Sequence, residues 1–109
     1  MKLPNSQKAI IAPSKLREYV LNIKHKRGGS KAHVLERCGY LPENWEDLDA
    51  EIRRHLGNDV DVYRMSDYGD RFEIRMQLAT PVGRLLNVRT VWQIDDGTDF
   101  PRLITLYPD

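Results

Sequence analysis

The sequence has little that would point to a secreted or membrane-bound protein. Cys38 is the only cysteine in 109 residues, so the chain cannot form an internal disulfide, as is usual in the reducing cytosol. Its apolar runs are far shorter than the roughly 18 to 20 residues that span a bilayer. Residues 1–6 also lack the apolar core of a secretory signal. We therefore expect a cytoplasmic protein without membrane contact.

Motifs for cofactors are missing as well. The glycine patterns GxxxxGK[ST], GxGxxG and GxSxG, which shape phosphate loops, dinucleotide sites and hydrolase elbows, do not occur. One cysteine and three separated histidines give no CxxC or HExxH motif, although tetrahedral zinc needs four close ligands. Asp59 and Asp61 begin like a calcium loop, but the glycine and glutamate that complete such a loop do not follow. We expect neither a nucleotide cofactor nor a metal ion.

What is present is the composition of an ordinary globular protein. Apolar residues make up 40% of the chain and charged residues 30%, which is enough apolar material for a continuous core. We find no internal repeat and no low-complexity linker. The sequence therefore predicts one domain that covers residues 1–109.

The net charge of +1 hides a strong asymmetry along the chain. Residues 1–40 carry a balance of +7, residues 41–70 a balance of −6, and residues 71–109 are neutral. Two interpretations are open. Either the two blocks face each other and neutralise one another, or the folded surface is dipolar and can attract an anion at its basic end.

The first half of the chain predicts three helices. Each follows a residue that commonly caps a helix N-terminus, and each carries apolar residues at helical spacing. The expected helices cover residues 15–23 after Ser14, 31–37 after Ser30, and 45–56 after Asn44, with Gly39 and Gly57 ending the second and third.

From residue 58 onward the apolar period changes to two, which is typical of strands. Four strands are expected over residues 60–65, 71–79, 85–94 and 102–107, and the short turns between them indicate an antiparallel meander. In the second strand, Arg71, Glu73, Arg75 and Gln77 form a polar face, so one side of the sheet takes the helices and the other meets water or a ligand. We predict an α+β fold with two or three N-terminal helices packed on a four-stranded antiparallel meander sheet.

One basic segment has the features of an anion site. The residues from Lys24 to His33 join a run of cations to a glycine pair and then to an expected helix N-terminus, where free backbone N–H groups attract phosphate or carboxylate. His25 in this run can act as a general base near neutral pH. The alternative is that the segment is a solvated surface loop and His25 a surface residue.

Several separated blocks resemble a family of small bacterial domains of unknown function that occur alone or at the C-terminal ends of polymorphic toxins. The blocks appear in the same order and span nearly the whole chain. They are Lys2–Asn5, Lys15–Tyr19, Gly29–Ala32, Val88–Trp92, Pro101–Leu103 and Tyr107–Pro108.

The expected order of helices and strands is also similar, more distantly, to the barnase, colicin and RelE superfamily of toxin ribonucleases. This resemblance implies cleavage of RNA without a metal ion, with a base for the 2′-hydroxyl and cations for the phosphate charge. It assigns the base or acid to His25, the phosphate contacts to Lys31, Arg89 and Arg102, and the lining of the site to Thr105 and Tyr107.

Strand alternation raises a difficulty for this assignment. It places Thr105 and Tyr107 on one face and Arg102 on the other, so these residues cannot converge unless a bulge or a sheet edge intervenes. Arg102 and Tyr107 have an alternative role as anchors of the last strand to the helix layer. Trp92 points away from Arg89 and is expected in the core.

Two hypotheses of function follow. The first is a toxin-related ribonuclease-like domain whose partner is RNA. The second is a non-catalytic protein-binding module, an immunity-type or accessory partner that presents an acidic helix, Glu46 to Glu51, to a basic protein. The sequence does not predict an oligomeric state.

Overall fold

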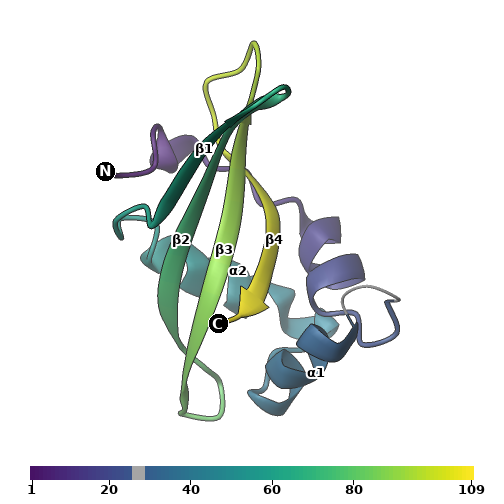
Figure 1. Cartoon of the computed structure of the whole chain (residues 1–109). Helices are drawn as coiled ribbons and strands as arrows, with labels where there is room; N and C mark the ends of the chain where they lie inside the picture. Colours follow the sequence, from purple (N-terminus) through teal and green to yellow (C-terminus); the bar gives the residue numbers. More distant parts are fainter. Residues whose placement is uncertain (26–28) are drawn as a thin grey trace.

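The computed structural model describes residues 1–25 and 29–109, so Lys26, Arg27 and Gly28 of the basic segment lie outside the described residues (Figure 1). Short helical segments precede the strands in chain order. The helical elements are η1 (Ser6–Lys8), η2 (Lys15–Val20), α1 (Gly29–Arg37), η3 (Pro42–Asn44) and α2 (Trp45–Arg54), and the strands are β1 (Val62–Ser66), β2 (Gly69–Ala79), β3 (Leu85–Asp95) and β4 (Arg102–Pro108).

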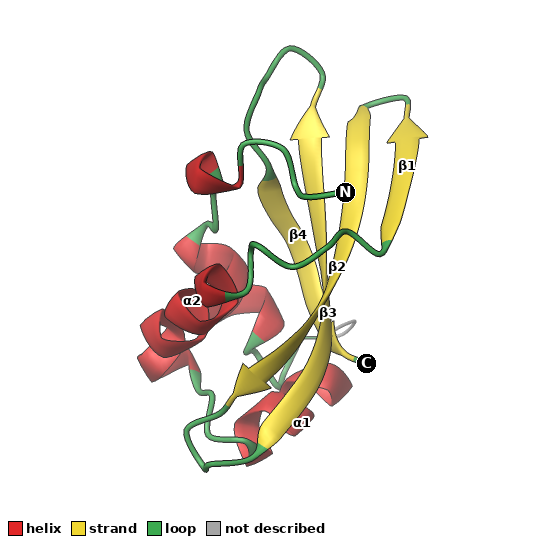
Figure 2. Cartoon of the chain, turned by 90° about the vertical axis from the view of Figure 1, so that its left-hand side faces the viewer, coloured by secondary structure: helices red, strands yellow, loops and turns green. Residues whose placement is uncertain are grey.

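The four strands form one antiparallel sheet in the order β1-β2-β3-β4, which confirms the predicted α+β meander. The helices lie on one side of this sheet and leave its other side uncovered (Figure 2). We call the uncovered side the open face. It is the side turned toward the viewer in Figure 1, where α2 lies behind the strands.

The core lies between the helices and the covered face of the sheet. Phe72, Ile74, Met76 and Leu78 alternate along β2 and are at most 2% exposed. Trp92 is fully buried, and its indole N–H donates to the Thr90 hydroxyl over 2.8 Å. The apolar alternation of the sequence thus marks the covered face, because successive side chains of a strand point to opposite sides.

The helix boundaries differ from those expected. The first segment, η2, is a six-residue π-helix that ends at Val20, and the N–H of Leu21 closes it by donating to the carbonyl of Leu16 over 2.8 Å. Its apolar stripe still packs inward, since Leu16 and Val20 are buried. None of the helices in the described part of the chain is long and apolar enough to cross a membrane.

The predicted N-caps were wrong. Ser14 and Asn44 make no side-chain hydrogen bond to the helices that follow them, and Ser30 lies inside α1, which begins at Gly29. The Asn44 carboxamide instead accepts from the N–H of Leu41 over 2.6 Å and donates to the carbonyl of Gly39 over 2.9 Å. This side chain therefore organises the turn before α2, because an amide can satisfy backbone donors and acceptors on either side of it.

Gly39 follows α1 as predicted, with a φ of 95° that a side chain rarely adopts. A Cβ atom there would also lie 2.9 Å from the Cβ of Pro81. The end of α2 was predicted too late, because the helix stops at Arg54 and a turn carries the chain to Gly57.

A buried carboxylate joins α2 to the end of β2. Glu51 is 6% exposed and accepts from the backbone N–H of Ala79 over 2.8 Å and from His55 Nε2 over 3.0 Å. Burial alone raises the pKa of Glu51, but these hydrogen bonds and the Arg54 charge outweigh it, so the pKa lies below its usual range. The Tyr40 hydroxyl donates to the carbonyl of Ala79, and burial, followed by the Glu51 charge, raises the pKa of Tyr40 to about 12.

Candidate functional site

A β-bulge in β4 changes which residues share a face. The pairing with β3 shifts between Leu103 and Thr105, so that Ile104 has no partner of its own. As a result Leu103 and Leu106, three positions apart, both point into the core and are 3% and 2% exposed. A bulge inserts one residue into the alternation and reverses its phase beyond that point.

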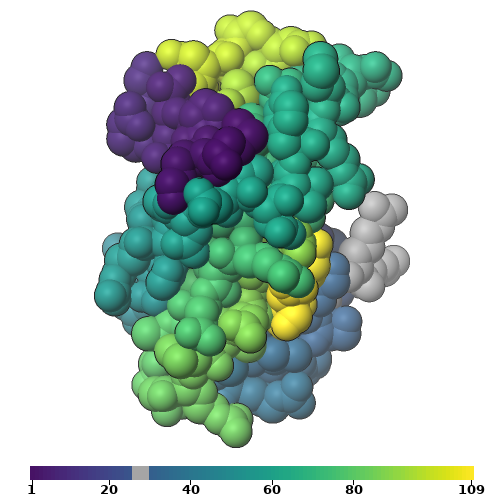
Figure 3. Space-filling view, turned by 60° about the vertical axis from the view of Figure 1, so that its left-hand side comes forward, coloured from purple at the N-terminus to yellow at the C-terminus, as the bar shows by residue number. Residues whose placement is uncertain are grey.

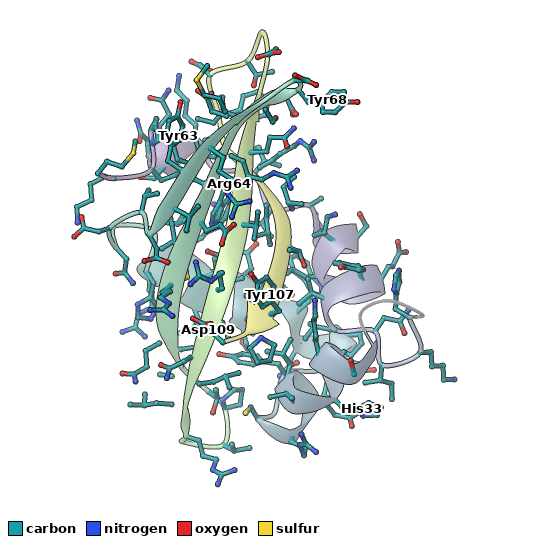
Figure 4. The ribbon with its side chains drawn as sticks, in the orientation of Figure 1. His33, Tyr63, Arg64, Tyr68, Tyr107 and Asp109 are labelled. Atoms are coloured by element: carbon teal, nitrogen blue, oxygen red, sulfur yellow. The ribbon has the colours of Figure 1, made fainter. Side chains whose placement is uncertain are left out.

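The bulge places the predicted site residues of β4 on the same side of the sheet. Arg102 lies opposite Gln93, and Tyr107 lies opposite Arg89. Directly opposed residues of antiparallel strands share a face, and with the bulge Thr105 joins them. Arg89, Arg102, Thr105 and Tyr107 therefore all belong to the open face, where Figure 4 shows Tyr107 near the end of the chain.

Arg89 is surrounded by carboxylates. Its guanidinium lies 2.8 Å from Asp61, 3.0 Å from Glu73 and 3.8 Å from Asp109, and its side chain is only 12% exposed. The hydrogen bond to Asp61 is the main reason why the pKa of Arg89 is raised, since burial acts in the opposite direction. The charge of Arg89 is thus balanced within the protein.

Arg102 is paired at the upper end of the open face. Its Nε and Nη2 atoms bind the two oxygens of Asp95 over 2.6 and 3.2 Å. The side chain of Gln93 donates to the same carboxylate over 2.6 Å, and Arg102 and Gln93 in that order lower the pKa of Asp95. Because 42% of the Arg102 side chain is exposed, this pair is accessible to solvent. Arg102 does not reach the helix layer through a hydrogen bond in the described part of the chain.

Lys31 brings α1 to the edge of the open face. Its ammonium group lies 4.8 Å from the centre of the Tyr107 ring, within the range of a cation–π contact. Lys31 and Thr105 also line, with Tyr19, Val20 and Leu106, a hollow that is too narrow to hold a water molecule. The first turn of α1 and the end of β4 therefore meet at this hollow, although they are far apart in the sequence.

His25 lies one aromatic ring away from that hollow. The imidazole packs edge-on against Tyr19, with the ring centroids 4.7 Å apart, and the ammonium group of Lys15 lies 5.3 Å from the same tyrosine ring. His25, Lys31, Thr105 and Tyr107 thus surround the junction of η2, α1 and β4. We call these four residues, with Tyr19, the junction cluster.

Sequence reasoning missed the carboxylates that hold the arginines of the open face. The alternation of β2 did place Glu73 on the polar face, but Asp61 and Asp109 reach Arg89 only through the register of β1 and the path of the last residues. In Figure 3 the last residues, in yellow, lie between the β2–β3 hairpin, in green, and the region of α1, in blue. Only the polar alternation carried a signal of this network.

Among the described residues, a single ion pair joins the basic and acidic blocks of the sequence. Lys2 pairs with Asp59 over 3.0 Å, whereas Lys8 pairs with Asp99, which lies outside the acidic block. Within residues 1–25 and 29–40, five cations have no carboxylate partner: Lys15, Arg17, Lys24, Lys31 and Arg37. They lie on or beside η2 and α1, at one side of the sheet (Figure 1). Ion pairs with the acidic block therefore do not neutralise these five cations.

The predicted acidic helix is partly used for internal contacts. Glu51 is buried, and Asp49 pairs with Arg53 over 2.7 Å. Only Glu46 and Asp47 of its four acids are exposed without a cation partner in the described structure. In that same part of the chain, no three His, Cys, Asp or Glu side chains form a group that could hold a metal ion.

The fold has a solved counterpart. A chain in a contact-dependent growth inhibition toxin–immunity protein complex from Klebsiella pneumoniae 342 superimposes with a TM-score of 0.75. The two chains are 12% identical, and the similarity covers 95% of this chain and 96% of the other. At this identity the likeness shows a shared fold.

Comparison of the sequences gives the family. No curated protein matches the chain. The family model described as "Domain of unknown function (DUF6883)" matches residues 2–109, which is nearly the whole chain. This match establishes that the chain belongs to the DUF6883 family.

Proposed function

We propose that this chain is a toxin-related ribonuclease domain that cleaves RNA at the junction cluster. The observation that carries the proposal is the meeting of an imidazole, a lysine and two hydroxyl groups where η2, α1 and β4 join. These are the group types that metal-independent cleavage of RNA requires. Five cations without carboxylate partners in the described residues lie around the same side and would attract the phosphate backbone.

The shared fold fits this role and also fits a binding protein, because the solved complex contains both a toxin and an immunity protein. We place the chain on the toxin side because its unpaired cations gather beside a cluster with acid–base groups. The alternative of an acidic docking helix has lost support, since Glu51 is buried and Asp49 is paired within the helix.

The chemistry would proceed by transfer of the phosphate to the neighbouring ribose. The 2′-oxygen attacks phosphorus while the bond to the 5′-oxygen breaks, one proton leaves the 2′-hydroxyl, and another reaches the 5′-oxygen. His25 would take the first proton while a water molecule supplies the second, or the water would take the first while His25 supplies the second. Lys31 would neutralise the phosphate, and the Thr105 and Tyr107 hydroxyls would donate hydrogen bonds to its oxygens.

The two arginines would have different parts in this scheme. Arg102 is accessible, and its pair with Asp95 can open to bind a neighbouring phosphate of the strand. Arg89 is nearly enclosed by three carboxylates, so its contribution would be to hold the charge balance of the face beside Tyr107. The phosphate contact in the centre of the site then rests on Lys31.

The direct test is cleavage of total RNA and transfer RNA at micromolar protein. We compare the wild-type chain with a His25→Ala, Lys31→Ala double variant, and expect at least a hundredfold loss of cleavage. The matched control is Lys8→Ala with His33→Ala, which removes the same residue types from exposed positions away from the junction cluster. The control should cleave within a few-fold of the wild type. A wild-type chain that cleaves no more than the double variant would overturn the proposal.

A salt titration with single-stranded RNA separates RNA binding from protein binding. The affinity should fall steeply with ionic strength, with a slope of about −0.7 per phosphate contact. An affinity that does not change with salt would point away from RNA.

A further inference from the structure

The two edges of the sheet differ in how far other segments cover them. The N-terminal segment pairs with the outer edge of β4 at its start, where Leu103 N–H donates to the Ile10 carbonyl over 3.0 Å and Ile10 N–H donates to the Pro101 carbonyl over 2.8 Å. The helical segments η2 and α1 pack against the same strand. Among the described residues, the outer edge of β1 has no such cover. In the part of the chain that the structure describes, β1 pairs with β2 alone.

The N-terminal residues pair with the segment that directly precedes β1. Val60 N–H donates to the Met1 carbonyl over 2.7 Å, and Lys2 forms an isolated bridge with Asp59. No described segment continues along Val62–Ser66 on that side. The backbone of five residues therefore stays available for pairing along its outer edge, which is the usual template for adding a strand from another chain.

Large apolar side chains are exposed on the same hairpin. Met65 is 80% exposed, Tyr68 77% and Tyr63 46%. Tyr63 and Met65 project on the face that carries Phe72, and the ring centres of Tyr63 and Phe72 lie 5.1 Å apart. The described helices do not extend over the part of this face that β1 forms (Figure 2). In Figure 3 the β1–β2 hairpin projects from the upper part of the molecule.

The strand lacks the features that usually protect an edge. Val62–Ser66 contains no proline and no lysine, and its single cation, Arg64, lies 3.9 Å from Glu73 on the open face. Natural edge strands are commonly blocked by such residues or covered by another element. An uncovered edge beside exposed aromatic rings is a feature of interaction surfaces.

The unpaired charges at the tip of the β1–β2 hairpin are acidic. Asp67 and Asp70 lie in the hairpin, and Asp96 is held beside it, because its N–H donates to the Tyr68 carbonyl over 3.0 Å. None of the three has a cation partner among the described residues. A segment that pairs with β1 would thus find apolar contacts along the strand and negative charge at its tip.

We propose that the outer edge of β1, with Tyr63, Met65 and Tyr68, docks an extended basic segment of a different protein, which adds a fifth strand to the sheet. The segment would carry lysine or arginine residues next to Asp67 and Asp96, and apolar side chains against Tyr63 and Met65. This surface is separate from the junction cluster, so the inference goes beyond the proposed function and does not depend on it.

A second copy of this chain fits the edge less well. Two β1 strands paired about a twofold axis would bring the unpaired acids of the two hairpins toward each other, which opposes association. The basic surface of the chain lies on η2 and α1, which are helical and offer no strand. The complementary partner is therefore another protein.

The test uses a labelled peptide with the sequence Lys-Lys-Thr-Val-Thr-Val-Thr-Lys-Lys, which carries its cations at the two ends of the strand, and its acidic analogue, in which glutamate replaces lysine. We expect saturable binding of the basic peptide by fluorescence anisotropy, at least tenfold tighter than the analogue. Amide hydrogen exchange should show new protection confined to residues 62–66. Equal binding of both peptides, or protection elsewhere, would overturn the proposal.

A matched pair of variants locates the binding. Met65→Lys places a cation on the edge of β1 and should weaken binding of the basic peptide at least tenfold. Leu85→Lys replaces an apolar side chain that is 64% exposed at a distant position, and it should leave the affinity for the peptide unchanged. Thermal unfolding verifies that both variants fold. Equal affinities of Met65→Lys and Leu85→Lys for the basic peptide would contradict the assignment of its binding to the edge of β1. A concentration-dependent dimer of the wild type that Met65→Lys abolishes would show that the partner at this edge is a second copy of the chain, which would overturn the proposal. RNA cleavage by Met65→Lys should equal that of the wild type, so this test and that of the proposed function can fail separately.

Discussion

The two faces of the sheet carry different kinds of side chain, apolar on the covered face and mostly charged or polar on the open face. On β2, Phe72, Ile74, Met76 and Leu78 are at most 2% exposed and face the helices. Their neighbours in the sequence face the other way and pair with charged or polar groups, as Arg75 does with Asp109 over 2.8 Å. Alternate positions of one strand thus hold the fold together on one side and carry the charged groups on the other.

This difference predicts where the protein tolerates change. The covered face contributes stability through close packing and burial, which depend on the shape of every side chain. The open face contributes through ion pairs that are partly screened by water, and such pairs are individually weak. Substitutions should therefore affect stability most on the covered face and activity most at the edge of the open face.

The largest effect on stability is expected for Trp92→Ala. The residue is fully buried and its indole N–H bonds to Thr90, so the truncation should lower the free energy of unfolding by about 3–5 kcal/mol. Urea unfolding gives this value, and Trp92→Phe serves as a milder variant if the alanine variant does not fold. Arg75→Ala, on the open face, should cost less than about 0.5 kcal/mol. Equal losses for Trp92→Ala and Arg75→Ala would break the distinction between the faces.

An intermediate effect is expected for Glu51→Ala, at the contact of α2 with β2. The substitution leaves the backbone N–H of Ala79 without its acceptor and should cost about 1–3 kcal/mol at neutral pH. Because the folded-state pKa of Glu51 is lowered, its contribution is complete above the ordinary glutamate pKa of about 4.3 and is lost as the pH falls through the lower folded value.

The difference in stability between wild type and Glu51→Ala should therefore shrink at acidic pH, as measured by urea unfolding between neutral pH and about pH 3. The control is Glu46→Ala, an exposed acid on the same helix, which should change little at any pH. A difference that grows as the pH falls would mean that Glu51 stabilises the fold in its protonated form.

A smaller effect is expected for Arg89→Met, in the centre of the open face. The variant keeps much of the side-chain volume but leaves Asp61, Glu73 and Asp109 without their shared cation. We expect a loss of about 1–2 kcal/mol at neutral pH, between the values for exposed and buried ion pairs. Urea unfolding compares it with Arg64→Met, which removes a 68% exposed cation 3.9 Å from Glu73 and should cost less than about 0.5 kcal/mol. Equal losses of unfolding free energy for Arg89→Met and Arg64→Met would show that the enclosure of Arg89 adds nothing to stability.

Much of the fold could be predicted from the sequence because the strands alternate so regularly. Every end of the four strands lies within two residues of its expected position, and Trp92 is in the core as expected. The helices were harder. Ser14 and Asn44 have the right chemistry for caps, but η2 is a π-helix and Asn44 is used by the turn before α2, and neither is determined by local preference alone.

The arrangement of the candidate site residues could be predicted only in part, because β4 contains a bulge. Simple alternation separates Arg102 from Thr105 and Tyr107, and only the bulge at Ile104 brings them to one face. A bulge depends on the pairing with β3, so no pattern within residues 102–108 reveals it. The same holds for Lys31 and Tyr107, whose contact depends on where α1 packs.

The most direct test of the central claim identifies the ends of the RNA fragments. Purified protein is incubated with transfer RNA in excess EDTA, and the products are analysed by mass spectrometry. Cleavage by the junction cluster predicts fragments with 2′,3′-cyclic phosphate and 5′-hydroxyl ends, which disappear with the His25→Ala, Lys31→Ala variant. Intact RNA, or fragments with 3′-hydroxyl and 5′-phosphate ends, would contradict the account.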